Sequence, residues 1–563
     1  RPSLASPRPR ARHTMALQVY SVSSSSNDKL QTLAEIARLG EGGVAGTPYG
    51  SDVAAMLNDS DAKVVRSACD TLAKLGSVGL QFSDAVAALL GSGDVQKRCY
   101  ALGALGAMGS GAAHHSADVV KLLGDTSPNV RAAAVVALGG MNVATEAKGI
   151  ADCLRDASPA VVSAAVTALA LLGPEGKASS GEVAKKLADP DKDVKASAVV
   201  YFAKFEDQAL AQADPICKLL QDEDISVRQS VVQLFEALKD KALPMADKAA
   251  QHLNHSDPRF KAAAALAVGG VGPAASAHGA KVAALLQDSS EDKSQLPLCV
   301  AGLEKRLPST LKMPACAACS ALASLGDPAH VSDLVQLLKS NHMDIRISAA
   351  HALGELGGSF VDPLGALLSD PRAQVRAAGC TALAKIAQKS GGLDSDSVKK
   401  IVACLEDNSP IVRSAALDAL AGTGEDCAAY TDTVKDMFLD KSIAVRISAM
   451  KAMASAGLKG QCYAPDVCRL IYDEAPAIRA AAAETLAEMG ERGASFADEI
   501  AELIPSDREE GVRVAVLSAM SKMGDSAKPL LHYIDAARED PSEAVRAAAE
   551  SAVTALTLEA IAE

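Results

Sequence analysis

The first candidates for chemistry are two cysteines, Cys316 and Cys319, separated by two residues. This spacing serves redox exchange or, when a second pair follows at zinc-finger distance, a zinc ion. No second pair follows at that distance, and the other cysteines are scattered along the chain. Cys69 and Cys380 share with Cys319 one position of a repeated segment, where Cys acts as a small apolar side chain. The sequence therefore predicts buried thiols without a metal.

Histidine is the next candidate, and it forms only two close groupings, His114-His115 and His252 with His255. A metal site needs several nitrogen, oxygen or sulfur ligands that converge on one point. Neither grouping has a carboxylate or cysteine set beside it in the sequence. We therefore expect these imidazoles to be solvated or packed, and we predict no metal ligand.

Two groups of glycines resemble a phosphate-binding loop in their spacing: Gly103, Gly106 and Gly109, and Gly269, Gly270 and Gly272. Such a loop needs a preceding strand or a Gly-Lys-Ser/Thr sequence, and neither is present. No Ser stands in the strand–turn–helix setting of a nucleophile elbow. The sequence thus predicts no catalytic residue, no cofactor-binding residue and no cofactor, and the protein is expected not to be an enzyme.

A different pattern dominates the chain, an Asp followed six residues later by an Arg. It recurs roughly every 33 residues, which is the signature of a repeat architecture. The pairs are Asp125/Arg131, Asp222/Arg228, Asp370/Arg376, Asp407/Arg413, Asp440/Arg446, Asp473/Arg479, Asp507/Arg513 and Asp540/Arg546. So many copies exclude a unique active site, so the pairs are expected to be structural.

Two helices must position each pair, as residues 117–140 illustrate. Apolar residues at helical spacing predict a first helix, helix A, which Asp125 ends. Ser127 is expected to cap the second helix, helix B, with Pro128 at its first position and a glycine at its end. The same combination of a capping residue and a following proline is expected at Ser158-Pro159, Asp257-Pro258, Asp370-Pro371, Ser409-Pro410 and Asp540-Pro541. Aligned on the Arg position, the chain contains about sixteen helix B segments.

The Asp at the end of helix A can accept hydrogen bonds from free N–H groups at the start of helix B. The same carboxylate can meet the Arg of its own or of the next repeat. Repeated along a stack, this makes a network in place of isolated surface pairs. The Asp position is occupied by Ser92, His255 and Ser340 in some repeats, whereas the last six repeats keep every pair.

The Asp before helix B, the Val-Arg at its start and the Ala-Leu near its end resemble the HEAT and armadillo-like repeats, especially the short HEAT-like units. The resemblance covers residues 28–563 and implies an all-α, right-handed α-solenoid of about sixteen antiparallel helix pairs with an Asp–Arg ladder. Deoxyhypusine hydroxylases are HEAT-like enzymes with His-Glu metal sites, and no His is followed by Glu here. Phycobiliprotein lyases also contain such repeats.

Composition limits the partners and the compartment. The net charge is -13, and an acidic body argues against nucleic acid as a partner. No run of 18 apolar residues occurs, so no transmembrane segment is expected. Scattered cysteines favour a reducing compartment, and we expect a cytoplasmic protein. Residues 1–27 are basic and Ser-rich, and they are expected to be a disordered targeting or extraneous segment, so organelle import stays open.

The repeats divide the chain into four parts. After residues 1–27 come the N-terminal repeats, residues 28–287, an irregular insertion, residues 288–314, and the C-terminal repeats, residues 315–563. The insertion breaks the period, and two interpretations stay open for it, a binding loop and a tolerated surface loop. The array runs to Glu563 without an evident polar capping repeat, which favours either an end covered within an assembly or a truncated chain.

Helix B lines the binding surface in families of this kind. The residue five positions after the Arg position varies in type, as an exposed ridge should: Val136, Thr167, Val200, Gln233, Leu266 and His351. The apolar members form either a groove for a partner helix or strand, or part of the core. Without Trp, binding of basic peptides as in importin-like proteins is not expected. We predict a non-enzymatic scaffold or subunit of a larger protein assembly, with a bilin lyase or a transport or ciliary adaptor as alternatives.

Overall fold

The computed structural model describes residues 26–41, 49–290, 313–326, 328–358, 361–390 and 392–558. These residues form α-helices and short 3-10 helices, without a strand among them, so the predicted all-α solenoid is confirmed. The chain divides into two compact units, Arg1–Ala249 and Ala250–Glu563, called unit 1 and unit 2 below. Almost all of residues 1–27 and most of the insertion lie outside the described residues.

The B helices are the long elements of each unit. In unit 1 they are α2 (Ser26–Glu41), α4 (Ala62–Lys74), α7 (Val95–Ala107), α9 (Pro128–Gly140), α11 (Pro159–Leu171), α14 (Lys192–Phe202) and α17 (Ile225–Leu238). In unit 2 they are α19 (Pro258–Gly270), α21 (Pro314–Leu325), α23 (Met343–Leu356), α25 (Ala373–Ser390), α27 (Pro410–Gly422), α29 (Ile443–Ser455), α32 (Pro476–Glu488), α36 (Glu510–Lys522) and α38 (Glu543–Leu558). Each of them coincides with a predicted helix B segment.

The A segments are shorter, and most combine one α-helix with a 3-10 turn. In unit 1 they are α3 (Gly50–Ala55) with η1 (Met56–Asn58), α6 (Ser83–Ala88) with η2 (Leu89–Gly91), α8 (Ser116–Lys121) with η4 (Leu122–Gly124), α10 (Ala147–Asp152) with η6 (Cys153–Arg155), α13 (Ser180–Lys186), and α16 (Ala213–Lys218) with η7 (Leu219–Gln221). α18 (Leu243–Gln251) contains the unit boundary, and η9 (His252–Asn254) follows it. Unit 2 continues with α20 (Gly279–Ala283) with η11 (Ala284–Gln287), α22 (Val331–Leu337), α24 (Val361–Leu367), α26 (Ser395–Ala403) with η13 (Cys404–Glu406), α28 (Thr431–Asp436) with η15 (Met437–Leu439), α31 (Ala464–Cys468) with η16 (Arg469–Tyr472), α34 (Ala497–Ala501) with α35 (Leu503–Ser506), and α37 (Leu531–Ala536) with η19 (Ala537–Glu539).

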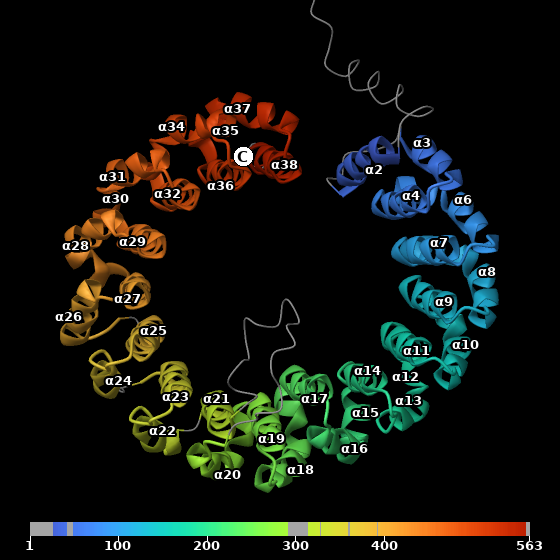
Figure 1. Cartoon of the computed structure of the whole chain (residues 1–563), viewed down its shortest axis with the longest axis horizontal. Helices are drawn as coiled ribbons and strands as arrows, with labels where there is room; N and C mark the ends of the chain where they lie inside the picture. The colour runs from blue at the N-terminus through green and yellow to red at the C-terminus, as the bar shows by residue number, and fades with distance from the viewer. Residues whose placement is uncertain are drawn as a thin grey trace, which may run out of the picture. The chain divides into compact units, whose positions relative to one another are not determined.

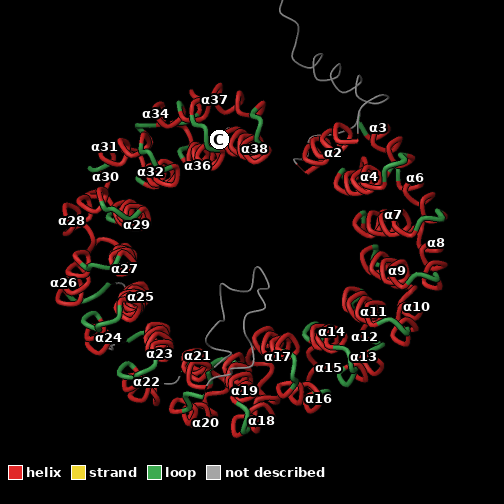
Figure 2. Tube along the Cα trace, viewed as in Figure 1, coloured by secondary structure: helices red, strands yellow, loops and turns green. Residues whose placement is uncertain are grey.

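Short connectors join each B helix to the next A segment. They are α5 (Ser77–Leu80), η3 (Gly109–His115), η5 (Ala144–Glu146), α12 (Pro174–Lys177), α15 (Glu206–Ala211), η8 (Lys239–Ala242), η10 (Pro273–His278), η12 (Pro328–His330), η14 (Gly424–Tyr430), α30 (Gly457–Gln461), α33 (Gly490–Ala494), η17 (Gly524–Ser526) and η18 (Lys528–Leu530). Within each unit the B helices form one row on the concave side, and the A segments form a second row on the convex side (Figures 1 and 2).

The starts of the B helices differ in one respect from the expectation. Ser127 stands at the N-cap of α9, but its side chain makes no capping hydrogen bond. The carboxylate of Asp125 instead accepts the Ser127 N–H, at 2.8 Å. The expected Pro at the first helical position is present in α9, α11, α19, α21, α27 and α32. It is not found at Asp370-Pro371 or Asp540-Pro541, because α25 and α38 begin two residues after these prolines.

The glycines near the ends of the B helices have two separate functions. α9 ends at Gly140, in agreement with the expected glycine at the end of helix B, and the positive φ of 53° falls at Asn142. A Cβ on Gly139 would lie 3.0 Å from the Cα atom of Ala168 on α11, so this glycine permits close helix packing. Gly109 (φ 67°) and Gly272 (φ 79°) do supply the turn after their helices.

The core of each unit consists mainly of Ala, Leu and Val from the two rows of helices. Cys69, Cys319 and Cys380 are fully buried in it, as expected for small apolar side chains. Burial raises the pKa of the Cys69 thiol to about 12, so this group stays protonated and unreactive at neutral pH. The periodic cysteines are therefore packing residues.

Candidate functional site

Most Arg residues of the repeated pattern contact two consecutive repeats, and Arg131 shows how. Its Nη1 donates to the backbone carbonyl of Asp125 in its own A–B turn, at 2.9 Å. Its Nε and Nη2 donate to both carboxylate oxygens of Asp156 in the next repeat, at 2.7 and 2.8 Å. The six-residue interval in the sequence therefore marks a contact between a guanidinium and a backbone carbonyl. The contact between the two charges joins different repeats.

The Asp of each pair completes the arrangement from the other side. Oδ1 of Asp156 accepts the N–H of Ser158 at 2.8 Å and so closes the turn before α11. Both oxygens of the same carboxylate accept from Arg131. The Asp thus meets the Arg of the preceding repeat, and the expectation of its own or the next repeat is corrected. The reason is that the Nη1 group of the repeat's own Arg is already held by the turn carbonyl.

We call each contact between the Arg or Lys of one repeat and the Asp of the next a rung, and the series of rungs the ladder. Unit 1 contains the rungs Lys29–Asp59, Arg98–Asp125, Arg131–Asp156 and Lys195–Asp222. Unit 2 contains Lys261–Asp288, Arg346–Asp370, Arg376–Asp407, Arg413–Asp440, Arg446–Asp473, Arg479–Asp507 and Arg513–Asp540. Arg546 donates to the carbonyls of Asp540 and Pro541. The six-residue search missed several partners, namely Lys29, Asp59, Arg98, Asp156, Lys261, Asp288 and Arg346. The interval of 24 to 31 residues from the Arg or Lys to the following Asp would have identified the inter-repeat pairs.

Arg228 makes the same contact with its own A–B turn as most of the other Arg residues of the pattern. Arg228 is buried, with 2% exposed, and its Nη1 donates to the backbone carbonyls of Asp222 and Glu223 at 2.7 and 3.0 Å. The carboxylate of Asp222 instead forms its rung with Lys195 of the preceding repeat. The next Asp position along the chain is occupied by His255, which has no carboxylate to offer. Arg228 therefore closes the turn of its own repeat, while the Asp222 carboxylate belongs to the rung with Lys195.

In some repeats another residue occupies the Asp position or the Arg position. Pairing between consecutive repeats explains where these replacements occur. Val65 occupies the Arg position that faces Ser92, and Ala315 occupies the one that faces Ser340. In each case both members of one rung are replaced together. At the Arg position of the repeat before Asp189 stands Val162, which cannot form an ion pair. Asp189 pairs with Lys186 of its own A segment, with 3.2 Å between Nζ and Oδ2. Asp288, the first residue of the insertion in the sequence, still forms a rung, and α21 begins at Pro314.

Hydrogen bonds from Arg lower the pKa of two ladder carboxylates of unit 2. Arg376 lowers the pKa of Asp407, and Arg413 lowers the pKa of Asp440, below the ordinary value for Asp. Both side chains of the Arg413–Asp440 rung are largely buried, with 15% and 9% exposed. These groups stay charged at neutral pH and have all their strong donors and acceptors engaged within the ladder. Their geometry supports a structural function.

The candidate ridge is exposed at five of its six predicted residues. Val136 and Val200 are 53% and 50% exposed, and Thr167, Gln233 and His351 are exposed as well. These two Val residues are therefore surface residues, which removes the core alternative for them. Leu266 is 8% exposed, so its assignment to the ridge is wrong. On α19 every residue from Ala262 to Val268 is buried, and Gly269 brings α21 so close that a Cβ there would lie 2.6 Å from Ala321 Cα.

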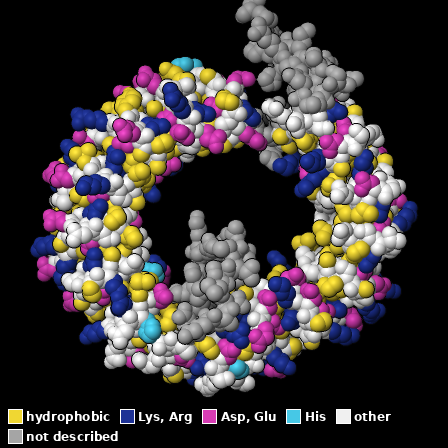
Figure 3. Space-filling view, in the orientation of Figure 1, with side chains coloured by type: hydrophobic (Ala, Val, Ile, Leu, Met, Phe, Trp, Pro, Cys, Tyr) yellow, Lys and Arg dark blue, Asp and Glu magenta, His cyan; other side chains and the backbone are white. Residues whose placement is uncertain are grey.

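The ridge changes character between the units. In unit 1 four successive B helices, α9, α11, α14 and α17, expose Val136, Thr167, Val200 and Gln233, without a charge among them. In unit 2 the equivalent exposed residues include Asp418, Lys451 and Glu484. Figure 3 shows acidic, basic and apolar side chains intermingled over the visible surface of each unit. The neutral stretch of unit 1 is the best candidate for apolar contact with a partner.

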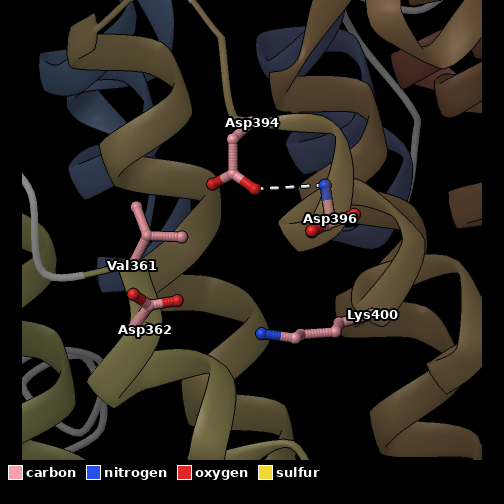
Figure 4. Close-up of a pocket in the computed structure, with 5 residues that line it drawn as sticks. All are labelled: Val361, Asp362, Asp394, Asp396 and Lys400. Carbon is pink, nitrogen blue, oxygen red and sulfur yellow. Dashed lines mark hydrogen bonds between the residues drawn. The ribbon is translucent and has the colours of Figure 1, made fainter.

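Unit 2 also has an open cavity of about 610 Å³ between α24 and α26, lined by Val361, Asp362, Asp394, Asp396 and Lys400 (Figure 4). Asp394 caps α26, since it accepts the N–H groups of Asp396 and Ser397 at 3.1 and 2.9 Å. A hydrogen bond from Ser397 lowers the pKa of Asp394, which keeps this capping carboxylate charged. One carboxylate of the lining, Asp394, is thereby explained by helix capping.

Comparisons with known proteins agree with this architecture. A family described as HEAT repeats matches residues 82–170, 300–364, 361–454 and 464–554, more than half of the chain. A structure of importin beta has a TM-score of 0.54 at 14% identity, covering 98% of this chain and 87% of that one. Yeast importin-beta (Kap95p) has a TM-score of 0.53 at 13% identity, covering 98% and 86%. A Kap121p mutant has a TM-score of 0.51 at 12% identity, covering 98% and 73%.

At these identities the likeness establishes the solenoid fold alone. No curated protein matched the sequence. Among the described helices, none combines the length and apolar character needed to cross a membrane.

Proposed function

Because this chain belongs to the family of HEAT-repeat proteins, we propose that it is a non-enzymatic scaffold that binds a partner protein along the ridge of unit 1. The supporting observation is the exposure of Val136 and Val200, about half of each side chain, on B helices of a solenoid. Monomeric proteins rarely leave contiguous apolar surface uncovered unless a partner uses it. Solenoids bind along extended concave surfaces, which is where the B helices lie.

The chemistry of the ridge favours an amphipathic helix of the partner. The exposed members on α9, α11, α14 and α17 are apolar or neutral, so they would contact an apolar face without leaving a charge unpaired. An amphipathic helix offers such a face at regular spacing. Thr167 already donates its hydroxyl to the Ser163 carbonyl at 3.0 Å, which lowers the cost of covering it.

The test compares the full-length protein with the double variant Val136→Asp, Val200→Asp. Both positions are exposed, so the two carboxylates leave the fold intact while opposing apolar contact. We expect a partner identified by affinity purification, then purified and titrated, to bind at least about tenfold more weakly, since burying one uncompensated charge costs several kcal/mol. Leu439→Asp is the matched control, because Leu439 is 85% exposed but lies in the A row of unit 2.

Equal affinity of the wild type and the double variant for the purified partner contradicts the proposal. Circular dichroism on both proteins excludes unfolding as the cause of any loss. The identity of the partner also separates the narrower functions within this proposal, which are a subunit of a larger assembly and a transport adaptor. We further propose a cytoplasmic location, which fractionation with an antibody against the full chain tests.

A further inference from the structure

We propose that Asp84, His114 and His115 bind one divalent transition-metal ion, with zinc the best fit, on the A row of unit 1. Asp84 lies on α6, and the two histidines end η3. One ligand atom from each side chain lies within 4.8 Å of the others, which makes this a convergent donor set. The two histidines have no carboxylate beside them in the sequence, and Asp84 of α6 supplies one in the folded chain.

The distances suit a tetrahedral ion. Nε2 of His115 is 3.3 Å from Oδ1 of Asp84, and Nε2 of His114 is 3.9 Å from the same oxygen. Ligands about 2.1 Å from a tetrahedral zinc stand about 3.4 Å from one another. The first distance fits this value already. The second needs only a small rotation of His114 and Asp84, whose side chains are 58% and 88% exposed.

The hydrogen bond of His114 prepares its ring for a metal. Nδ1 of His114 lies 3.2 Å from the carbonyl oxygen of Gly111. A carbonyl can only accept, so Nδ1 carries the proton and Nε2 has a free lone pair. Metal-binding histidines commonly donate their second nitrogen in this way, which fixes the tautomer and the orientation of the ring.

His115 provides the second, independent observation. His115 is 7% exposed, and its buried Nε2 atom has no hydrogen-bond partner. The 3.3 Å approach to Asp84 lacks hydrogen-bond geometry, so the carboxylate alone does not satisfy this nitrogen. Buried polar atoms without a partner are costly, and a metal ion between Nε2 and the carboxylate would remove that cost. Two imidazoles and one carboxylate, with water as a fourth ligand, form a set typical of zinc.

Such an ion would join the A segment α6 to η3, the connector between α7 and the next A segment, α8. The B-helix ridge lies on the other row, so the site is separate from the proposed partner surface. Mg²⁺ is expected to bind much more weakly, because it prefers oxygen ligands in an octahedral arrangement.

The experiment is a titration of the full-length protein, prepared without a polyhistidine tag and stripped with a chelator, with Zn²⁺ by calorimetry. We expect one tight site per chain, and at least about tenfold weaker binding for Asp84→Asn and for His114→Ala, since even outer-shell changes cost about 10–100-fold. Co²⁺ should give the visible absorption of a tetrahedral ion in the wild type only.

His532→Ala is the matched control, because His532 is an exposed histidine on α37 of unit 2. It is expected to leave the tight site unchanged. Asp84→Asn alters an exposed side chain without changing its shape, so it keeps the fold. The proposal fails if the stripped wild type has no tight Zn²⁺ site. It also fails if both variants bind Zn²⁺ as the wild type does.

Discussion

In unit 2, six rungs follow one another from Arg346–Asp370 to Arg513–Asp540, whereas unit 1 has a rung missing at Val65 and another at Val162. The geometry differs as well. Four rungs of unit 2 are doubly hydrogen-bonded through Nε and Nη2, namely Arg376–Asp407, Arg413–Asp440, Arg479–Asp507 and Arg513–Asp540. In unit 1 that geometry occurs at Arg131–Asp156, while two other rungs use Lys.

Both units also join repeats by close approach of helix backbones, in unit 2 at Gly269 and Gly354. A Cβ on Gly106 of α7 would lie 2.9 Å from the Cα atom of Ala137 on α9, and Gly139 makes the same kind of contact with Ala168. The comparison teaches that one repeat can be joined to the next by charge or by close packing. A bidentate Arg–Asp rung depends on pH and on both partners, whereas a Gly–Ala contact depends on volume alone.

Acidification should have the largest effect on this difference, because it acts on every rung at once. The pKa values of Asp407 and Asp440 are lowered in the folded protein, so their rungs contribute stability that is complete above the ordinary Asp pKa of about 3.9. That contribution is lost as the pH falls through the lower folded value. We expect hydrogen exchange, corrected for intrinsic rates, to show unit 2 losing more protection than unit 1 between pH 7 and pH 3. Equal losses in the two units would contradict the comparison.

Removing one Arg should be the strongest single change. Arg413→Ala leaves the Asp440 carboxylate, which is 9% exposed, without its guanidinium partner. The expected cost is about 2 kcal/mol, between the values for exposed and fully buried pairs. Repeats unfold partly independently, so local hydrogen exchange in α27 and α29 is the measurement. Lys29→Ala in unit 1 is the control and should cost at most about 1 kcal/mol, because its side chain is 25% exposed and makes a single contact.

Two glycines of α7 test the close packing of unit 1. Gly106→Ala places a methyl group against Ala137 and should cost about 1–3 kcal/mol through overpacking. Gly103→Ala on the same helix meets no atom within 4 Å and should gain about 0.5–1 kcal/mol from helix propensity. Local hydrogen exchange in α7 and α9 measures both variants. If Gly106→Ala stabilised the protein, the close contact between α7 and α9 would not require a glycine at this position.

Restoring a missing rung should have the smallest effect. Val162→Arg places a guanidinium opposite Asp189, which now pairs with Lys186. The expected gain is about 1 kcal/mol or less, because the new rung replaces an existing ion pair and buried Val packing. Hydrogen exchange in α11 and α14 is the measurement. Val162→Leu is the control, since it changes the packing without adding a donor.

Much of the fold followed from the sequence, because the signals for single helices are local. The Asp–Arg interval, the prolines and the apolar spacing located every B helix, including α21 after the insertion. The exposure of Val136 and Val200 followed from the same alignment. Leu266 did not follow, because its burial depends on how closely α21 approaches α19, which is a contact between repeats. The rung between Lys195 and Asp222 did not follow either, because it joins two consecutive repeats.

The sequence by itself determined the repeat, its two helices and the positions of the charged residues within it. Helix periodicity, turn residues and charge spacing are properties of neighbouring residues, so they can be read along the chain. Only the tertiary structure decided which Arg meets which Asp, and that Asp84 lies beside His114 and His115. These contacts join residues about one repeat apart, and they depend on how each helix pair stacks on the next. The ladder is therefore visible in the sequence as a period, but its pairing arises from stacking.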